Sequence, residues 1–366
     1  MKKLIALLLA LAMVLGLIAC GAKEEAAPEA APEATPEAAP EAAPEAAPEA
    51  APAETDYEGK MGYFYAFPHP FGNGCKVGAD AWEAEKGIDC NIVIGPDDTL
   101  TSQLDALEAM VSQGVVAIGT FPMDPGTYEG LYEDWASKGI VANNLGWDSI
   151  GEESGAEHLI ATNIYNSAWK SMEYVGEKLG NKGGIMLCYE SLTDAATKER
   201  LQAVSDYCAK YPEIKIVCEA ADVKTAAEAS LKIENMLNAY PDQVDAIVSL
   251  GFTCTQALCG LLPEYYDRGN EKMVVMGIDT DDIIFEGLRN GVLDATVAQN
   301  TAGIGYIGME VCKLQVDGYR AKEGKYHIDT GIVLVTADNI ETYEQDLEAV
   351  TQEIIATLTT EYMEKK

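Results

Sequence analysis

The chain has 366 residues, of which 25 are lysine or arginine and 60 are aspartate or glutamate, so its formal net charge is −35 at pH 7. Phosphate backbones and anionic membrane surfaces repel a protein of this charge, which argues against nucleic acid as a partner. The length is sufficient for two domains with separate cores.

The N-terminal segment reads as an export signal. Residues 1–19 contain two lysines, a long apolar run and then small residues, the order found in secretory signal peptides. The stretch LIACG at 17–21 resembles the bacterial lipoprotein cleavage box, in which the cysteine becomes the lipid-bearing first residue. We therefore expect lipidation at Cys20 and an extracytoplasmic protein that is lipid-anchored to the bacterial cell membrane.

Residues 20–56 are predicted to be the lipidated cysteine followed by a tether. From Ala26 to Ala53 the sequence repeats PEAA, with a proline at every fourth residue over much of its length. Such a repeat blocks continuous helix and offers no hydrophobic face to bury.

Short apolar runs then alternate with amphipathic stretches, a pattern that predicts βαβ units and parallel sheets. The pattern restarts after Thr162, so we expect an α/β protein with two doubly wound, parallel-sheet lobes. The predicted first lobe is 57–162 plus 300–330, and the predicted second lobe is 163–299 plus 331–340. Residues 341–366 carry an apolar stripe at helical spacing, which predicts a C-terminal helix packed along a lobe or, alternatively, binding a partner.

Other chemistry-bearing motifs are weak. The stretch GIGYIG at 303–308 fits a dinucleotide fingerprint, but no acidic residue follows where a ribose contact is needed, so we interpret its glycines as packing residues and expect no cofactor. The three histidines lack metal-ligand spacing, which predicts no metal site. Eight cysteines follow Cys20, and the sequence leaves open whether they form disulfides or are buried thiols.

Aromatic and polar residues follow the predicted strands, where open α/β sheets bind small molecules. Rings offer faces for stacking, and the polar groups can bond a ligand. The candidate ligand-binding residues from this pattern are Phe67, His69, Phe71, Phe121, Trp147, Asp148, Glu190, Phe252, Asp279 and Gln299.

The segment MGIDTDDIIFEGLRNGVLDATVAQNTAGIGYIGMEV at 276–311 resembles the bacterial periplasmic sugar-binding proteins of the ribose-binding type, which are solute-binding components of ABC importers. The resemblance implies two lobes joined by three crossovers, the type I periplasmic binding protein fold, closing around a sugar. It implies that Asp279 accepts sugar hydroxyls and that Gln299 touches the ligand at the hinge. It also adds Arg200, at the start of a second-lobe helix, and Thr162, at a crossover, to the expected ligand-binding residues.

Three positions depart from the family pattern. Phe121, Gly146 and the pair Gly251-Phe252 stand where the family usually has hydrogen-bonding side chains. Because a buried unpaired polar group on a ligand costs about 1 to 3 kcal/mol, we expect a ligand with a flat or apolar face, such as a modified sugar, a glycoside or a nucleoside.

The expected function is binding without catalysis. The lobes would close on the ligand, and an ABC permease in the membrane would recognise the closed, monomeric protein. Presentation of the ligand to a chemoreceptor or sensor kinase, and an exported enzyme, remain alternatives. A DNA-binding repressor is excluded because a lipobox and acidic tether stand where its headpiece would be.

Overall fold

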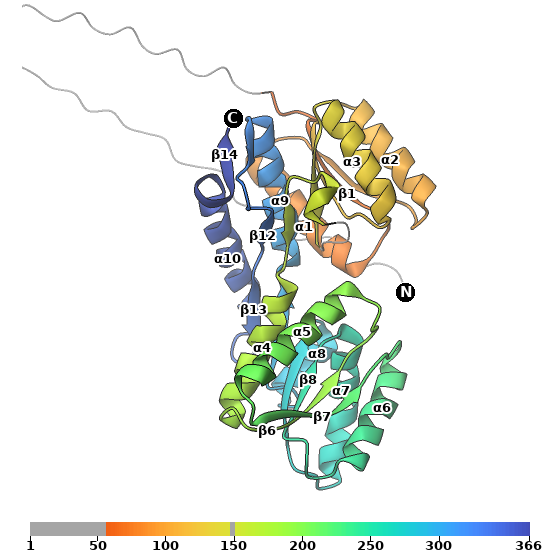
Figure 1. Cartoon of the computed structure of the whole chain (residues 1–366), viewed down its shortest axis with the longest axis vertical. Coiled ribbons are helices and arrows are strands. Elements are labelled where there is room, and N and C mark those ends of the chain that lie inside the picture. The colour runs from red at the N-terminus through yellow and green to blue at the C-terminus, as the bar shows by residue number, and fades with distance from the viewer. Residues whose placement is uncertain (1–55, 147–150) are drawn as a thin grey trace, which may run out of the picture. The chain divides into compact units, whose positions relative to one another are not determined.

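The computed structural model describes residues 56–146 and 151–366. The predicted signal peptide and tether, with Cys20, lie outside this part, as do Trp147 and Asp148. Residues 54–366 form one compact unit, in which the described residues make two six-stranded sheets and one two-stranded sheet. Figure 1 shows the helices gathered into two lobes, each around its own sheet.

The first lobe is built on a six-stranded parallel sheet in the order β12-β5-β4-β3-β1-β2. Its strands are β1 (Met61–Tyr65), β2 (Asn91–Ile94), β3 (Ala117–Thr120), β4 (Val141–Leu145), β5 (Leu159–Ala161) and β12 (His327–Asp329). Its helices are α1 (Pro70–Lys86), α2 (Leu100–Ser112), α3 (Pro125–Ser137) and α9 (Thr301–Val316), with a short 3₁₀ turn at Glu152–Ser154.

Strand β1 shows why this sheet is covered on both faces. Tyr63 and Tyr65 point into the core under α1 and α9, whereas Phe64 and Ala66 point into the core under α2 and α3. All four are buried, because successive side chains of a strand face opposite sides. A strand covered on both faces, such as β1, is therefore expected to be a continuous run of apolar residues in the sequence.

The second lobe repeats the plan with the order β13-β10-β9-β8-β6-β7. Its strands are β6 (Gly183–Cys188), β7 (Ile214–Ala220), β8 (Ala246–Ser249), β9 (Val274–Ile278), β10 (Ala295–Gln299) and the antiparallel edge strand β13 (Ile332–Val335). Its helices are α4 (Ile164–Leu179), α5 (Ala195–Lys210), α6 (Ala226–Ala239), α7 (Phe252–Asp267) and α8 (Asp282–Arg289). Two doubly wound, parallel-sheet lobes were predicted from the alternation of apolar runs, and this fold class is confirmed.

Three crossovers join the lobes. The chain passes from β5 to α4, from β10 to α9, and from β12 to β13. Hydrogen bonds tie two of these crossovers together, since the backbone N–H groups of Asn163 and Gly331 both donate to Oδ1 of Asp329, over 2.9 and 3.0 Å.

The C-terminal segment differs from the single helix expected for 341–366. Helix α10 (Tyr343–Thr357) continues into a π-helical turn at Leu358–Tyr362, and the chain ends in strand β14 (Met363–Lys365). Strand β14 pairs antiparallel with β11 (Tyr319–Ala321), which follows α9 in the first lobe. The segment thus passes from the second lobe back to the first, beside the crossovers (Figure 1).

The glycines of GIGYIG lie inside helix α9, not in a strand-to-helix loop. A Cβ atom on Gly305 would stand 1.8 Å from the backbone oxygen of Cys75 in α1, and one on Gly308 would stand 3.1 Å from Leu145. These glycines therefore allow close packing of α9 against α1 and the sheet, which agrees with their interpretation as packing residues.

All eight cysteines in the described residues are free thiols, and six of them are buried. Across the same residues, no helix has both the length and the apolar character needed to cross a membrane.

Candidate functional site

A cavity of about 630 Å³ lies where the carboxyl ends of the two sheets meet at the crossovers. The first lobe contributes Phe71, Gly146 and His327 to its lining, among others. The second lobe contributes Asp194, Glu199 and Arg200. Thr162 and Gln299 line it at the crossovers. Of the predicted ligand-binding residues, the structure brings Phe71, Thr162, Arg200 and Gln299 together on this surface.

Phe71 forms the aromatic wall of the cavity. It is the second residue of α1, and its ring meets the Phe121 ring edge-on at 6.3 Å between centroids and 88°. Gly146, with φ +82°, ends β4 beside both rings, and a Cβ there would stand 2.5 Å from Phe121 and 2.9 Å from Phe71. Gly146 thus makes room for the wall, which accounts for the missing polar side chain at this position.

Phe121 corrects a prediction. Its side chain is 0% exposed and belongs to the core under α1 and α9, where it also packs on Tyr65 at 4.6 Å. The ring cannot reach a ligand from there, so Phe121 supports Phe71 from behind instead of lining the cleft.

Phe67 and His69 lie on the same turn, between β1 and α1, and their side chains contact other residues of that turn. Phe67 is half-buried and its ring packs edge-on against Tyr65 at 5.7 Å. Exposed His69 caps α1, because its Nδ1 accepts from the backbone N–H of Phe71 over 3.2 Å. Neither residue lines the cavity. Of the aromatic side chains on this turn, only Phe71 lines it, and Phe67 and His69 lie beside it.

Arg200 lines the cavity and has one unsatisfied donor. Its Nη1 donates to the backbone oxygen of Leu250 over 3.3 Å, while its Nε is buried without a hydrogen-bond partner among the described residues. A buried donor without an acceptor costs about 1 to 3 kcal/mol, so the guanidinium is not fully satisfied by its protein contacts.

Asp279 stands directly behind the cavity lining, in the first position after β9. Its carboxylate Oδ1 accepts from the side-chain amide of Gln299 over 2.6 Å, and its backbone oxygen accepts from the hydroxyl of Thr296 over 2.8 Å. Its φ is +66°, a left-handed conformation that is uncommon for a residue other than glycine. Burial raises the pKa of Asp279 above its ordinary value, while the Gln299 bond and the charge of Arg200 counteract this.

Two further predicted residues, Glu190 and Phe252, lie outside the cavity lining. Glu190 is engaged as a helix cap, because its Oε1 accepts from the backbone N–H of Thr253 over 2.7 Å at the start of α7. Gly251 precedes that helix and has no side chain with which to cap it. Phe252 is the first residue of α7, is 38% exposed, and does not line the cavity.

The sequence did not reveal three polar lining residues. Asp194 caps α5 by accepting from the backbone N–H of Thr197 over 2.8 Å, and Glu199 Oε1 accepts from the backbone N–H of Tyr165 over 3.3 Å. His327 Nε2 lies 3.0 Å from the backbone oxygen of Ala161. The cap pattern DAAT was readable as a helix start, but nothing local to His327 shows that β12 brings it beside β5.

No group of three or more His, Cys, Asp or Glu residues that could hold a metal ion occurs within 56–146 and 151–366. The site is instead a cavity with one aromatic wall, an arginine, an amide, a histidine and two carboxylates. This mixture suits a small neutral molecule that carries several hydroxyl groups.

Known structures share this fold. A solute-binding protein from Burkholderia graminis, solved with D-arabinose, superposes with a TM-score of 0.65 at 23% identity, covering 79% of this chain and 99% of that one. A periplasmic ribose ABC transporter protein from Conexibacter woesei gives a TM-score of 0.68 at 18% identity, covering 83% and 99%.

Curated relatives are similar over most of the chain. The xylitol-binding protein of Mycolicibacterium smegmatis is 22% identical over 270 residues, which are 73% of this chain and 74% of that protein. The D-allose-binding periplasmic protein of Escherichia coli is 25% identical over 265 residues, or 70% and 82%. The family model described as a periplasmic binding protein domain matches residues 64–320. The chain therefore belongs to the periplasmic binding protein family, with the type I fold of its sugar-binding members.

Proposed function

We propose that this chain is the extracytoplasmic solute-binding protein of an ABC importer and that it binds a sugar or polyol between its lobes. The observation that carries the proposal is the cavity lined from both lobes, to which the first lobe contributes the Phe71 ring and the second lobe contributes Arg200. A sugar ring has an apolar face for Phe71 and oxygens for Arg200.

The polar lining changes the expected ligand. Phe121 and Phe252 do not reach the cavity, whereas Asp194, Glu199 and His327 line it. The site is therefore richer in hydrogen-bonding groups than the sequence indicated, and a small polyhydroxylated ligand fits it better than a nucleoside or a glycoside. The xylitol-, D-apiose- and D-allose-binding relatives support this ligand class.

The proposal extends to the rest of the chain. The first lobe would comprise 57–162 plus 300–330, and the second 163–299 plus 331–340, closing as two bodies about the crossovers. Lipid on Cys20 and the PEAA repeat would tether a monomer to the membrane near its permease. The protein would release its ligand unchanged, because its output is a conformation and not a product.

The test begins with the ligand that the protein itself selects. Native mass spectrometry of the purified chain identifies any bound small molecule, and calorimetric titration then compares xylitol, D-allose, D-arabinose and myo-inositol with adenosine. We expect micromolar or tighter binding of one of the sugars or polyols. Binding of adenosine alone would refute the ligand class, and chemical conversion of the bound compound would refute a role without turnover.

A further inference from the structure

Helix α10 and the residues after it form a fourth link between the lobes. At its start, the Tyr343 ring packs on Phe285 of α8 at 5.4 Å between centroids, and Leu347 packs against the second-lobe core. At its end, Leu358 and Met363 are 0% exposed in the first-lobe core. The segment is thus anchored by half-buried side chains in the second lobe and by fully buried ones in the first.

The middle of α10 is fastened to the hinge by Asn300. The side-chain Nδ2 of this residue donates to Oγ1 of Thr351 and to the backbone oxygen of Thr330, both over 2.9 Å. Its Oδ1 accepts from the backbone N–H of Gly303 over 2.9 Å, and Asn300 is 1% exposed. One buried amide therefore connects the second crossover, the third crossover and α10.

A close contact between Gly331 and Val350, one residue before Thr351, also connects the third crossover to α10. Gly331 of the third crossover has φ +75°, and a Cβ there would stand 2.6 Å from Cγ1 of Val350. Thr330 is thus joined to α10 through Asn300, and Gly331 lies directly against Val350. A movement of the crossovers would therefore be transmitted to the helix.

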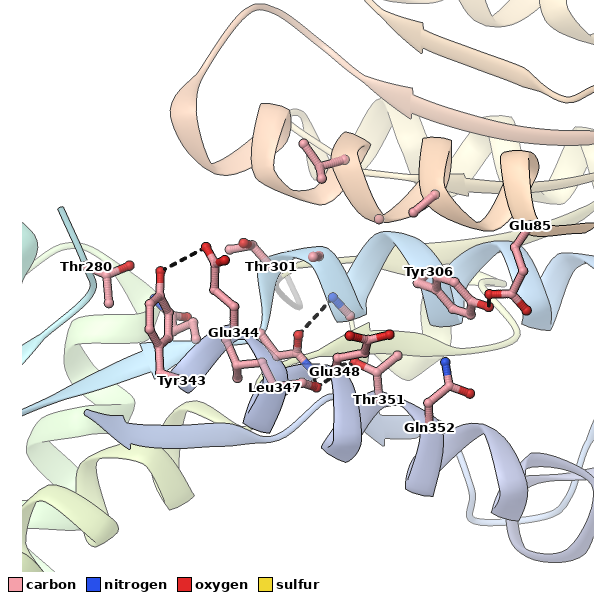
Figure 2. A pocket seen from close by; sticks show the side chains of 17 residues that line it. Glu85, Thr280, Thr301, Tyr306, Tyr343, Glu344, Leu347, Glu348, Thr351 and Gln352 are labelled. Atoms are coloured by element: carbon pink, nitrogen blue, oxygen red, sulfur yellow. Dashed lines mark hydrogen bonds between the residues drawn. The ribbon is translucent and has the colours of Figure 1, made fainter. Parts of the chain in front are cut away.

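This link lies on the side of the hinge away from the ligand cavity. A second cavity, of about 460 Å³, is lined by α1, α9 and α10, and Figure 2 shows Thr351 and Gln352 of α10 facing it opposite Glu85 and Tyr306. Within the described residues, the two cavities have only Gln299 in common, and no residue of α10 lines the first. Closure of the lobes about the crossovers would therefore open this rear side and stretch the link that is anchored in both lobes.

We propose that α10 is a strap across the rear of the hinge that opposes closure, with Thr351 and Asn300 as the positioning residues that fasten it. This inference rests on the proposed function only for its effect on ligand affinity. Loosening the strap raises the population of the closed form without ligand, and it tightens ligand binding because less of the binding energy is spent on closure.

The experiment measures the distance between the lobes in the full-length, ligand-free protein. Fluorescent dyes on unnatural amino acids at the exposed positions Asn73, in α1, and Thr193, before α5, report this distance by single-molecule energy transfer. Thr351→Val removes the hydroxyl at nearly constant volume. We expect a closed-to-open ratio about three- to tenfold higher than in the wild type, the range that corresponds to one hydrogen bond, with ligand affinity tighter by a similar factor.

The controls separate the strap from general stability. Thr351→Ser keeps the hydroxyl and should restore the wild-type ratio. Thr357→Val removes a hydroxyl that bonds within α10, to the backbone oxygen of Ile354 over 2.8 Å, and should change nothing. Val350→Ala loosens the contact on Gly331 and should shift the closed-to-open ratio in the same direction as Thr351→Val. It replaces Thr351→Val as the test if that variant does not fold.

Unchanged or longer distances in both Thr351→Val and Val350→Ala would overturn the strap. A wild-type protein that binds no sugar or polyol would instead overturn the proposed function. The distance measurement needs no ligand, so the two failures are distinguishable.

Discussion

Gln299 donates its side-chain amide to Oδ1 of Asp279 over 2.6 Å, joining the last residue of β10 to the first residue after β9. Gln299 also lines the ligand cavity and the rear cavity. The group that fixes the carboxylate in the second lobe is therefore itself part of the hinge. If this pair contacts the ligand as proposed, its contacts and the movement of the lobes would be coupled through one hydrogen bond.

Asp279→Asn should weaken ligand binding by about 2 kcal/mol, because a charge-assisted acceptor becomes a neutral amide. The free energy of unfolding of the ligand-free protein should not fall. Asparagine tolerates the left-handed backbone at this position, and the change removes a carboxylate whose burial is unfavourable. Calorimetric titration and urea unfolding measure the two effects. Equal affinity in the wild type and the variant would remove Asp279 from the site.

The raised pKa of Asp279 gives a second prediction, on pH. Since the folded-state pKa lies above the unfolded one, the carboxylate destabilises the folded protein above that folded pKa, and this cost disappears as the pH falls through it. Ligand affinity should also fall as the pH falls through the folded-state pKa of Asp279, because protonation removes the charged acceptor. Titrations over a series of pH values should show this loss in the wild type and not in Asp279→Asn.

Phe71 and Phe121 should separate binding from stability. Phe71→Ala removes the half-buried wall and should weaken ligand binding by about 1 to 2 kcal/mol with little effect on unfolding. Phe121→Ala empties a fully buried position and should cost about 3 to 5 kcal/mol of folding free energy. Affinity and the urea midpoint are measured for each variant. If Phe71→Ala bound ligand as tightly as the wild type, the aromatic wall would not contact the ligand.

The sequence predicted those parts of the fold that follow from local patterns. Apolar runs such as IMLC at 185–188 identify strands buried on both faces, and the intervening amphipathic stretches identify helices. Strands β5, β11, β12 and β14 were missed because each has only three residues, too few for a periodic pattern. The pairing of β14 with β11, which returns the chain to the first lobe, depends on tertiary contacts alone.

The ligand site, like the strand pairing, could be predicted only where local sequence patterns determine it. Phe71 and Gln299, which the sequence singled out near strand ends, line the cavity, whereas Phe121, singled out in the same way, is buried in the core. Which way a side chain points after a strand depends on the loop that follows, and single-sequence patterns do not encode it. His327 reaches the cavity through strand pairing between segments 166 residues apart, so no local signal could reveal it.

Gly305→Ala tests the interpretation of GIGYIG as packing glycines. Its methyl group would stand 1.8 Å from the backbone oxygen of Cys75, so α1 and α9 must separate, and the loss of folding free energy should be about 3 kcal/mol or more. Gly260→Ala is the matched control in α7, where nothing lies within 4 Å of the new Cβ, and it should stabilise the protein by about 0.5 to 1 kcal/mol. Similar unfolding midpoints for the two variants would contradict the packing role.

His158 should make the protein less stable in mild acid. The residue is 0% exposed and its Nδ1 lies 3.1 Å from the backbone oxygen of Lys325. Burial lowers the pKa of His158 to about 4, whereas an exposed histidine titrates near 6.5. Between these values the unfolded chain binds a proton that the folded protein does not, so the free energy of unfolding should decrease by about 1.4 kcal/mol per pH unit as the pH falls.

His158→Gln is the variant that isolates this contribution, because glutamine keeps a polar side chain but cannot be protonated. Urea unfolding of the wild type and the variant at pH values between 4 and 7 gives the two slopes. The variant should start with a lower free energy of unfolding at pH 7, since the buried imidazole fits its site, and should then lose less on acidification. Parallel curves would mean that His158 does not carry the acid sensitivity, and that carboxylates paired in the folded protein must account for it.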